Sequence, residues 1–263
     1  MKTILPKKMK FCILCSVLLL FSKSTMAQAS LRDILLSQLS TKHSATQATF
    51  GHTLLSAHFD DHFCTKEMMT KQLNFSIAKE GNCFLLSAEH FGYSHYGELK
   101  VGAGYGRRFG NRFSLALIGY YILNHAEGYS NIHSFTIGIS SHCQITQKAD
   151  IALSIDNPIH MRYGIVGEEP IPMRFALTFS LQTGERLITN IYGEKRLPGA
   201  LDLGIETFYR PLPSLTLSGV CSLTKIGIGM HIPCKKIMFT IQCDWHYKTG
   251  ITPQGTLYYF SAK

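Results

Sequence analysis

The chain has 263 residues, a formal net charge of +9 and 45% hydrophobic residues. Five of its 26 lysine and arginine residues, and none of its 17 acidic residues, lie in residues 1–29, so residues 30–263 carry only +4. That charge is too small to indicate a nucleic-acid-binding protein. No proline- or serine-rich linker divides residues 30–263, which favours a single domain.

Residues 1–29 have the order of a secretory signal peptide. Four lysines within the first ten residues precede an uncharged apolar stretch, which leads to the small residues Ala27 and Ala29. The apolar stretch is well short of the roughly 20 residues that a membrane-spanning helix needs. We therefore predict export, with cleavage of the signal peptide after Ala29.

Residues 30–46 contain the clearest helical pattern in the rest of the chain. Leu31, Ile34, Leu35 and Leu39 recur at the spacing of one helix face. The segment could fill the interior of a larger structure as a plug, or pack beneath it as a periplasmic cap. The spacing of the residues favours neither arrangement.

Most of the remaining sequence alternates between apolar and polar residues. Residues 174–182 place Phe175, Leu177 and Phe179 on one face, and residues 237–248 repeat the pattern with Phe239 and Ile241. Such alternation is typical of β-strands with one apolar face. The segments are as long as tilted membrane-crossing strands, and several apolar faces end in aromatic residues, which favours a membrane barrel over a soluble sandwich.

We predict an all-β fold: an antiparallel transmembrane β-barrel of about 14 strands over residues 47–263, preceded by the short helix. Short and long connections alternate between the strands, as expected when one end of a barrel faces the periplasm. The predicted strands are residues 47–59, 72–80, 83–91, 97–109, 112–125, 132–144, 149–157, 172–182, 186–195, 200–210, 214–223, 225–233, 236–248 and 253–262.

The polar faces of these strands predict the residues that line the lumen. On two of these strands, the residues predicted to face lipid are Leu203, Ile205, Phe239, Ile241 and Trp245. The charged residues of the same strands are expected on the opposite face, because a charge on the lipid face is costly. The lumen-facing candidates are Glu98, Lys100, Arg108, Asp156, Asp202, Glu206, Asp244, His246 and Lys248.

The last strand has the features of a barrel-assembly signal. Gly255, Tyr258 and Phe260 combine an early glycine with two aromatic residues on one face. Until the last strand pairs with the first, its edge is exposed and can be extended by a recognition factor. We therefore expect this strand to be recognised by the barrel-assembly machinery of a Gram-negative outer membrane.

Motifs for catalysis, cofactors and metals are missing. The sequence has no G-x-S-x-G and no H-E-x-x-H motif, and the glycines from Gly102 to Gly106 alternate along a strand instead of leading into a helix. His58 and His62 share a face only on a helix, whereas their segment is predicted to leave a strand. We predict no enzyme activity, no cofactor and no metal site.

Six cysteines follow the signal peptide, at positions 64, 83, 143, 221, 234 and 243. They lack the spacing of zinc sites, and an exported protein reaches an oxidising compartment. Cys143, Cys221 and Cys243 occupy apolar strand positions, where a cysteine packs as a small hydrophobic residue. This favours packing, but the sequence leaves disulfide formation open.

Several stretches of the C-terminal half resemble a known family. They are Ile151 to Pro172 with its Asn-Pro and Glu-Pro-Ile-Pro segments, Arg174 to Ser180, Leu203 to Pro211, Ile226 to Met230 and Gly250 to Pro253. About 110 residues are similar to the long-chain fatty-acid transporter (FadL) type of outer-membrane barrel, and more narrowly to its PorV/PorQ branch, which works with the type IX secretion machinery.

The resemblance implies two roles for an outer-membrane protein surrounded by lipid. The PorV/PorQ branch implies an accessory barrel that binds partner proteins of a secretion system, and the many charges expected in the lumen favour this role. The alternative is a FadL-like transporter or channel for small molecules, hydrophobic ones included.

Overall fold

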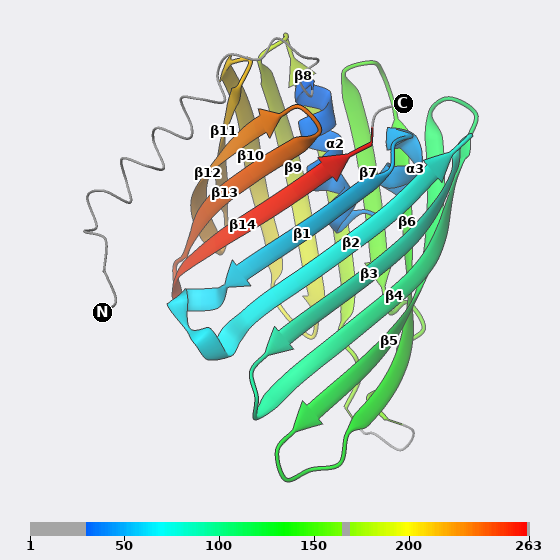
Figure 1. Ribbon diagram of the computed structural model, residues 1–263, viewed down its shortest axis with the longest axis vertical. Helices are drawn as coiled ribbons and strands as arrows, with labels where there is room; N and C mark the ends of the chain where they lie inside the picture. Colours follow the sequence, from blue (N-terminus) through cyan, green and yellow to red (C-terminus); the bar gives the residue numbers. More distant parts are fainter. Residues whose placement is uncertain (1–29, 165–168, 262–263) are drawn as a thin grey trace, which may run out of the picture.

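The computed structural model describes residues 30–164 and 169–261 (Figure 1). Fourteen antiparallel strands form one closed barrel, in which each strand pairs with its neighbours along the chain and β14 pairs with β1. The predicted fold class, an all-β barrel with a short N-terminal helix, is confirmed. The predicted signal peptide lies outside the described residues.

The strands keep close to the predicted ranges. The helical elements are α2 (Leu31–Lys42), α3 (Ala45–Phe50), η2 (His62–Cys64) and η3 (Lys66–Met68). The strands are β1 (Leu54–Asp61), β2 (Met69–Lys79), β3 (Asn82–Gly92), β4 (Tyr96–Phe109), β5 (Phe113–Ala126), β6 (Ile132–Gln144), β7 (Ala149–Asp156), β8 (Met173–Thr183), β9 (Leu187–Leu197), β10 (Leu201–Leu212), β11 (Leu215–Ser222), β12 (Lys225–Cys234), β13 (Ile237–His246) and β14 (Gly250–Phe260).

The start of the barrel differs from the prediction. Residues 47–50, expected in the first strand, belong to helix α3, and β1 begins only at Leu54. Ala45 and Ala48 are fully or almost fully buried against small and aliphatic side chains of the barrel wall. Gly51, with φ of +70°, then ends the helix in the left-handed conformation that glycine adopts without strain.

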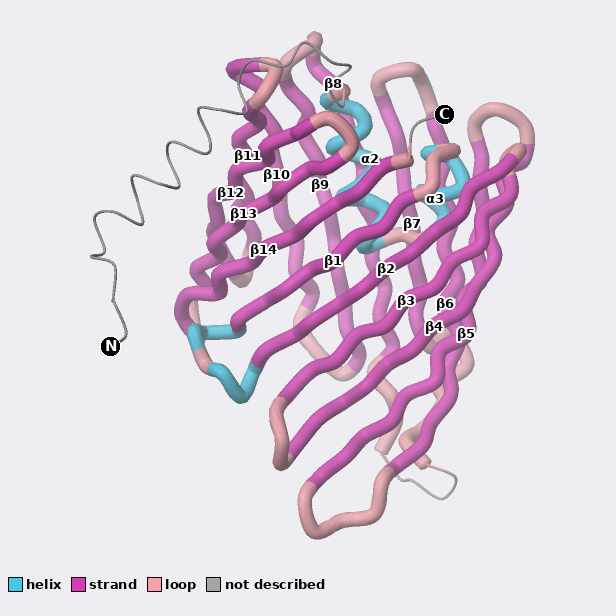
Figure 2. Tube along the Cα trace, in the orientation of Figure 1, coloured by secondary structure: helices cyan, strands magenta, loops and turns pink. Residues whose placement is uncertain are grey.

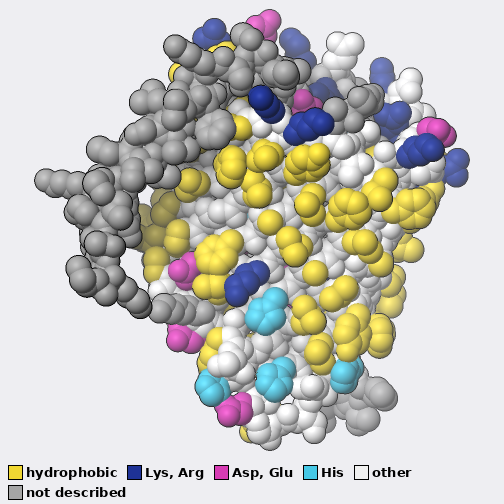
Figure 3. All heavy atoms as spheres, in the orientation of Figure 1, with side chains coloured by type: hydrophobic (Ala, Val, Ile, Leu, Met, Phe, Trp, Pro, Cys, Tyr) yellow, Lys and Arg dark blue, Asp and Glu magenta, His cyan; other side chains and the backbone are white. Residues whose placement is uncertain are grey.

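The alternation of the sequence separates an apolar exterior from a polar interior. Leu203, Ile205, Phe239, Ile241 and Trp245 point outward and are 47–59% exposed. Figure 3 shows hydrophobic side chains over the middle of the barrel wall, Lys and Arg at the end where β14 finishes, and His at the opposite end. An exterior of this kind suits a hydrocarbon environment, where outward charges are costly.

The two ends of the barrel differ in their connections. At the end where β14 finishes, the connections are turns of two to four residues, such as 80–81 and 145–148. The opposite end carries the longest connection, residues 157–172, and the β1–β2 connection that contains η2 and η3. We call the first end the turn end and the second the loop end. None of the helices among the described residues is long and apolar enough to cross a membrane.

A charge introduced on the exterior tests the orientation of the strands. Ile241→Arg should lower the free energy of unfolding by about 2–4 kcal/mol in phospholipid vesicles, because it places a charge at the middle of the lipid-facing wall. Asn111→Arg, in the exposed turn between β4 and β5, should change it by less than about 0.5 kcal/mol. Urea titration of both variants provides the measurement. Equal effects would show that Ile241 does not face lipid.

Candidate functional site

Helix α2 enters the barrel from the turn end. Its N-cap, Ser30, forms a capping box: Ser30 Oγ accepts a hydrogen bond from the Asp33 amide at 3.1 Å, and Asp33 Oδ2 accepts one from the Ser30 amide at 2.8 Å. Arg32 donates to the carbonyl of Gln147 at 2.6 Å and to Asp150 Oδ1 at 3.1 Å, on the turn between β6 and β7 and the start of β7. These contacts fix the start of α2 at the rim.

The connection between α2 and α3 reaches the middle of the lumen. His43 Nε2 lies 2.9 Å from Thr178 Oγ1, in the middle of β8, and Ser44 Oγ lies 2.6 Å from Ser140 Oγ of β6. Helix α3 then returns toward the turn end, where the Phe50 ring lies 5.7 Å from that of Phe260. Figure 2 shows both helices surrounded by strands. The two helices therefore form a hairpin inside the barrel, which we call the plug hairpin.

Apolar contacts hold the plug hairpin in the lumen. Leu31, Leu35 and Leu39 form one buried cluster with Ile188 and Phe208 of β9 and β10. On another side of α2, Ile34 packs with Leu54, Met238 and Tyr258. All four apolar residues of the helical stripe thus contact the inner wall.

Two cavities border the plug hairpin inside the lumen. The larger, of about 350 Å³, lies between α2 and residues of β1, β8–β10 and β12–β14. Among the described residues that line it, Leu39 is the single aliphatic one, and the others are polar, charged or aromatic. The smaller, of about 120 Å³, is lined by residues that include Lys100, Tyr120 and Arg174. The residues that line the larger cavity are therefore mostly polar, whereas the smaller cavity also has aliphatic residues such as Leu85 and Ile118.

A charge network borders the smaller cavity. Arg174 donates to Glu194 Oε1 at 3.0 Å and to Asp156 Oδ2 at 3.2 Å, and Arg196 donates to the same oxygen of Glu194 at 3.1 Å. Lys100 lies over the Tyr120 ring, with its Nζ 4.2 Å from the ring centroid. Arg174 on β8 thus pairs with carboxylates on both neighbouring strands, β7 and β9.

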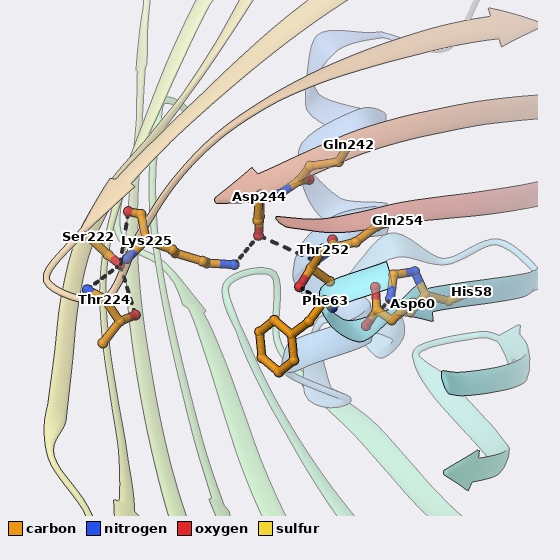
Figure 4. Close-up of polar contacts among 10 residues, drawn as sticks. All are labelled: His58, Asp60, Phe63, Ser222, Thr224, Lys225, Gln242, Asp244, Thr252 and Gln254. Carbon is orange, nitrogen blue, oxygen red and sulfur yellow. Dashed lines mark hydrogen bonds and ion pairs between the residues drawn. The ribbon is translucent and has the colours of Figure 1, made fainter. Parts of the chain in front are cut away.

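A second network borders the larger cavity (Figure 4). Asp244, which is fully buried, forms an ion pair with Lys225 and accepts hydrogen bonds from Gln242 Nε2 at 2.8 Å and Gln254 Nε2 at 3.3 Å. Two strands from β13 in the sheet, on β1, His58 Nε2 lies 3.1 Å from Asp60 Oδ2.

The β1–β2 connection folds toward the inside of the barrel at the loop end. The Phe63 amide donates to Thr252 Oγ1 of β14 at 3.4 Å, and the Phe63 ring lies 5.7 Å from the His246 ring of β13. Phe63 has a φ of 61°, a conformation that is uncommon for a bulky residue. This aromatic residue therefore narrows the barrel near His246.

The structure brings only some of the sequence-predicted lumen residues together. Asp244 and Glu206 are buried, Asp156 and Lys100 border the smaller cavity, and His246 borders the larger one. Glu98 and Asp202 are half-buried on β4 and β10, Arg108 is exposed at the turn end, and Lys248 lies in the exposed turn after β13 instead of in a strand.

Sequence reasoning did not select several residues that complete these networks. Arg174 and Asn190 lie on the polar faces of β8 and β9. The alternation of apolar and polar residues along these strands could therefore have identified both as lumen-facing. Lys225 starts β12 and meets Asp244 only through the pairing of β12 with β13. Gln38 and Lys42 reach the larger cavity only because the plug hairpin lies inside the lumen.

The residues of the predicted assembly signal lie on both faces of β14. Tyr258 is 3% exposed and, with Phe260, faces the plug hairpin, and the two rings stack with centroids 6.3 Å apart. Gly255 pairs with Phe59 and Ile241, on the outward face. Recognition of this strand by the assembly machinery stays a prediction.

The six described cysteines are free, and Cys221 and Cys243 are exposed on the exterior. In the described part of the chain, no group of three or more His, Cys, Asp or Glu side chains is placed to hold a metal ion.

The barrel is similar to solved structures of channels and transporters. No family model and no curated protein matches the chain. CymD, a monoaromatic hydrocarbon channel, has a TM-score of 0.62 and 8% identity, covering 86% of this chain and 93% of that one. The toluene transporter TbuX of Ralstonia pickettii has a TM-score of 0.60 and 11% identity, covering 84% and 92%. The toluene transporter TodX of Pseudomonas putida has a TM-score of 0.62 and 9% identity, covering 84% and 92%.

At these identities the similarity concerns the fold alone. This chain shares the closed barrel fold of these structures, and its 14 antiparallel strands agree with the barrel fold that the FadL resemblance implies. The comparisons give no support to the narrower PorV/PorQ part or to a secretion role.

Loss of the rim contact should loosen the plug hairpin. Arg32→Ala removes charged hydrogen bonds worth about 1.5–3 kcal/mol, so the amides of α2 should exchange with deuterium about tenfold faster or more. Arg186→Ala, in an exposed turn at the same end, is the matched control and should leave exchange in α2 unchanged. Hydrogen exchange with mass spectrometry gives the comparison. Unchanged exchange in the Arg32 variant would mean that this contact does not hold α2.

Proposed function

We propose that this chain is an integral outer-membrane channel for small polar molecules, closed in the described conformation by the plug hairpin. The observation that carries the proposal is the cavity of about 350 Å³ inside a closed barrel, bordered by Lys42, Asp60, Glu206 and Lys225. A lumen of this kind offers polar contacts to a solute and excludes lipid from it.

Three features support the outer membrane as the location. The exterior carries outward apolar side chains such as Ile205 and Ile241. The closed sheet leaves no strand edge unpaired, which is the condition for strands to cross a bilayer. The predicted signal peptide would direct the chain out of the cytoplasm.

The polar lining favours polar over hydrocarbon solutes. The similar structures are named as hydrocarbon channels or toluene transporters. In this chain, a hydrocarbon in the larger cavity would displace water from groups such as Asp60, Asn190 and Glu206 without offering them hydrogen bonds. We therefore propose solutes that can replace those hydrogen bonds.

The plug hairpin sets a condition for passage. The clusters around Leu35 and Ile34 fill the lumen between α2 and the wall at the turn end. A solute can therefore cross the barrel only if α2 and α3 move or leave. We propose that the contacts of Arg32 with Gln147 and Asp150 keep the channel closed.

The second candidate is the accessory barrel of a secretion system that the PorV/PorQ resemblance implies. A filled lumen favours this role, since a barrel that only binds partner proteins needs no passage. The experiment below tests the first candidate, because a channel closed by the plug hairpin has to become permeable when the hairpin is removed.

Removal of the plug hairpin should open the barrel. Deleting residues 31–50 should speed vesicle swelling in a small neutral sugar by at least about tenfold over the full chain, because a 14-strand lumen is wider than side chains alone can fill. Vesicles without protein give the background, and heat-modifiable migration on gels verifies that the variant forms a barrel. A folded variant that leaves swelling at the background rate would refute the channel and favour the accessory role.

A further inference from the structure

We infer that the larger cavity is a binding site for a small organic cation with a primary ammonium group, and that Glu206 is the counter-ion. This inference rests on the proposed channel function and names its class of solute. It depends on the charges and hydrogen bonds around Glu206.

Glu206 is a buried carboxylate with little to balance its charge. It lies on the inward face of β10 with 9% of its surface exposed and borders the larger cavity. Its Oε2 accepts one hydrogen bond, from Asn190 Nδ2 at 3.3 Å. Of the ion pairs among the described residues, none includes Glu206. Burial of an unpaired carboxylate is costly, so the position favours a cation.

The cations that border the cavity already have other partners. Lys225 forms its ion pair with Asp244, and Arg196 pairs with Glu194. Lys42, at the end of α2, lies over the Tyr192 ring, with its Nζ 5.1 Å from the ring centroid. Glu206 is therefore available to a cation from outside the chain.

Further acceptors near Glu206 match the donors of an ammonium group. Asn190 is 2% exposed, and its Oδ1 is buried without a hydrogen-bond partner in the described structure. Gln38 Oε1, which approaches the cavity from α2, is also without one. An ammonium group has three donors and no acceptor, so it suits a cavity whose lining offers a carboxylate and amide oxygens without donors of their own.

The volume and the apolar lining of the cavity indicate a compact ligand with a short carbon chain. A volume of about 350 Å³ lies near the lower limit of ligand pockets, which suits a compact molecule. Leu39 and the rings of Tyr192 and Tyr258 border the cavity and offer contacts to a short carbon chain. The aromatic faces can also attract a cation.

Other classes of ligand fit less well. An anion would meet the carboxylates of Glu206 and Asp60, while the basic residues around it are already engaged. A neutral solute could donate hydrogen bonds but would leave the charge of Glu206 unbalanced. A chelated metal ion lacks ligands, because the described residues include no cluster of three His, Cys, Asp or Glu side chains.

Three probes of similar size test the charge preference: butylammonium, 1-butanol and butyrate. Isothermal titration of the full chain in nanodiscs should show butylammonium binding at least about tenfold more tightly than either of the others, which corresponds to one strong charged contact. Glu206→Gln keeps the shape of the side chain and should lower the affinity for butylammonium at least about tenfold. Glu185→Gln, in an exposed turn, is the matched control and should bind like the unmodified chain.

The inference is overturned if the three probes bind equally or if Glu206→Gln binds butylammonium as the unmodified chain does. It is also overturned if butylammonium binds to the Lys42→Gln variant but not to the unmodified chain, because Lys42 would then be the resident partner of Glu206. Heat-modifiable migration verifies the fold of each variant.

Vesicle swelling separates this inference from the channel proposal. Selective binding of butylammonium by a barrel that stays impermeable after deletion of residues 31–50 would support the site and refute the channel. If deletion of residues 31–50 makes the vesicles swell but the full chain binds butylammonium no more tightly than 1-butanol or butyrate, the channel is supported and the site is overturned.

Discussion

Closure of the sheet is the constraint on which the other features depend. β14 pairs with β1 from Leu54 opposite Phe260 to Asp60 opposite Gln254. Without that pairing, two strands would leave rows of backbone donors and acceptors in lipid, each costing several kcal/mol. A closed barrel also gives every strand one outward face and one lumen face. The period-two alternation of the sequence therefore has to persist around the whole wall.

A closed wall of 14 strands encloses more space than its side chains fill, and the plug hairpin occupies part of that space. The wall accommodates the hairpin with small residues. A Cβ added at Gly106 would lie 3.2 Å from Ala116 Cβ and 3.5 Å from Ala48 Cβ of α3. Larger residues at these positions would push α3 away from the wall. Gly106 of β4 thus has a packing role here.

The sequence predicted the wall better than its contents. The alternation that places Ile241 outward and Asp244 inward is local, so it can be read without knowing any contact. Helix α3 could not be read in this way, because the alternation within residues 47–50 resembles a strand and its helical form depends on contacts with Cys83 and Ala116. The sequence also placed Lys248 in a strand as a lumen-facing residue. The strand β13 ends at His246 instead, because the following turn sets its end and the alternation does not.

The polar networks also depend on distant contacts. Lys225 meets Asp244 because the register of β12 and β13 places Gly227 opposite Asp244. A Cβ at Gly227 would lie 2.1 Å from Asp244 Oδ1, so the glycine leaves room for the carboxylate beside the backbone of β12. Such a pairing follows from strand register, which the sequence patterns alone left open.

The plug hairpin links the proposed site to the proposed passage. Glu206 and Asn190 belong to the wall, whereas Gln38 and Lys42 belong to α2. A cation that binds Glu206 and Gln38 together stabilises the plugged state, because Gln38 lies beside the wall only while the hairpin is in the lumen. The same cation meets the charge of Lys42, which favours withdrawal of the hairpin. The balance between Gln38 and Lys42 therefore decides whether a bound solute keeps the barrel closed or helps to open it.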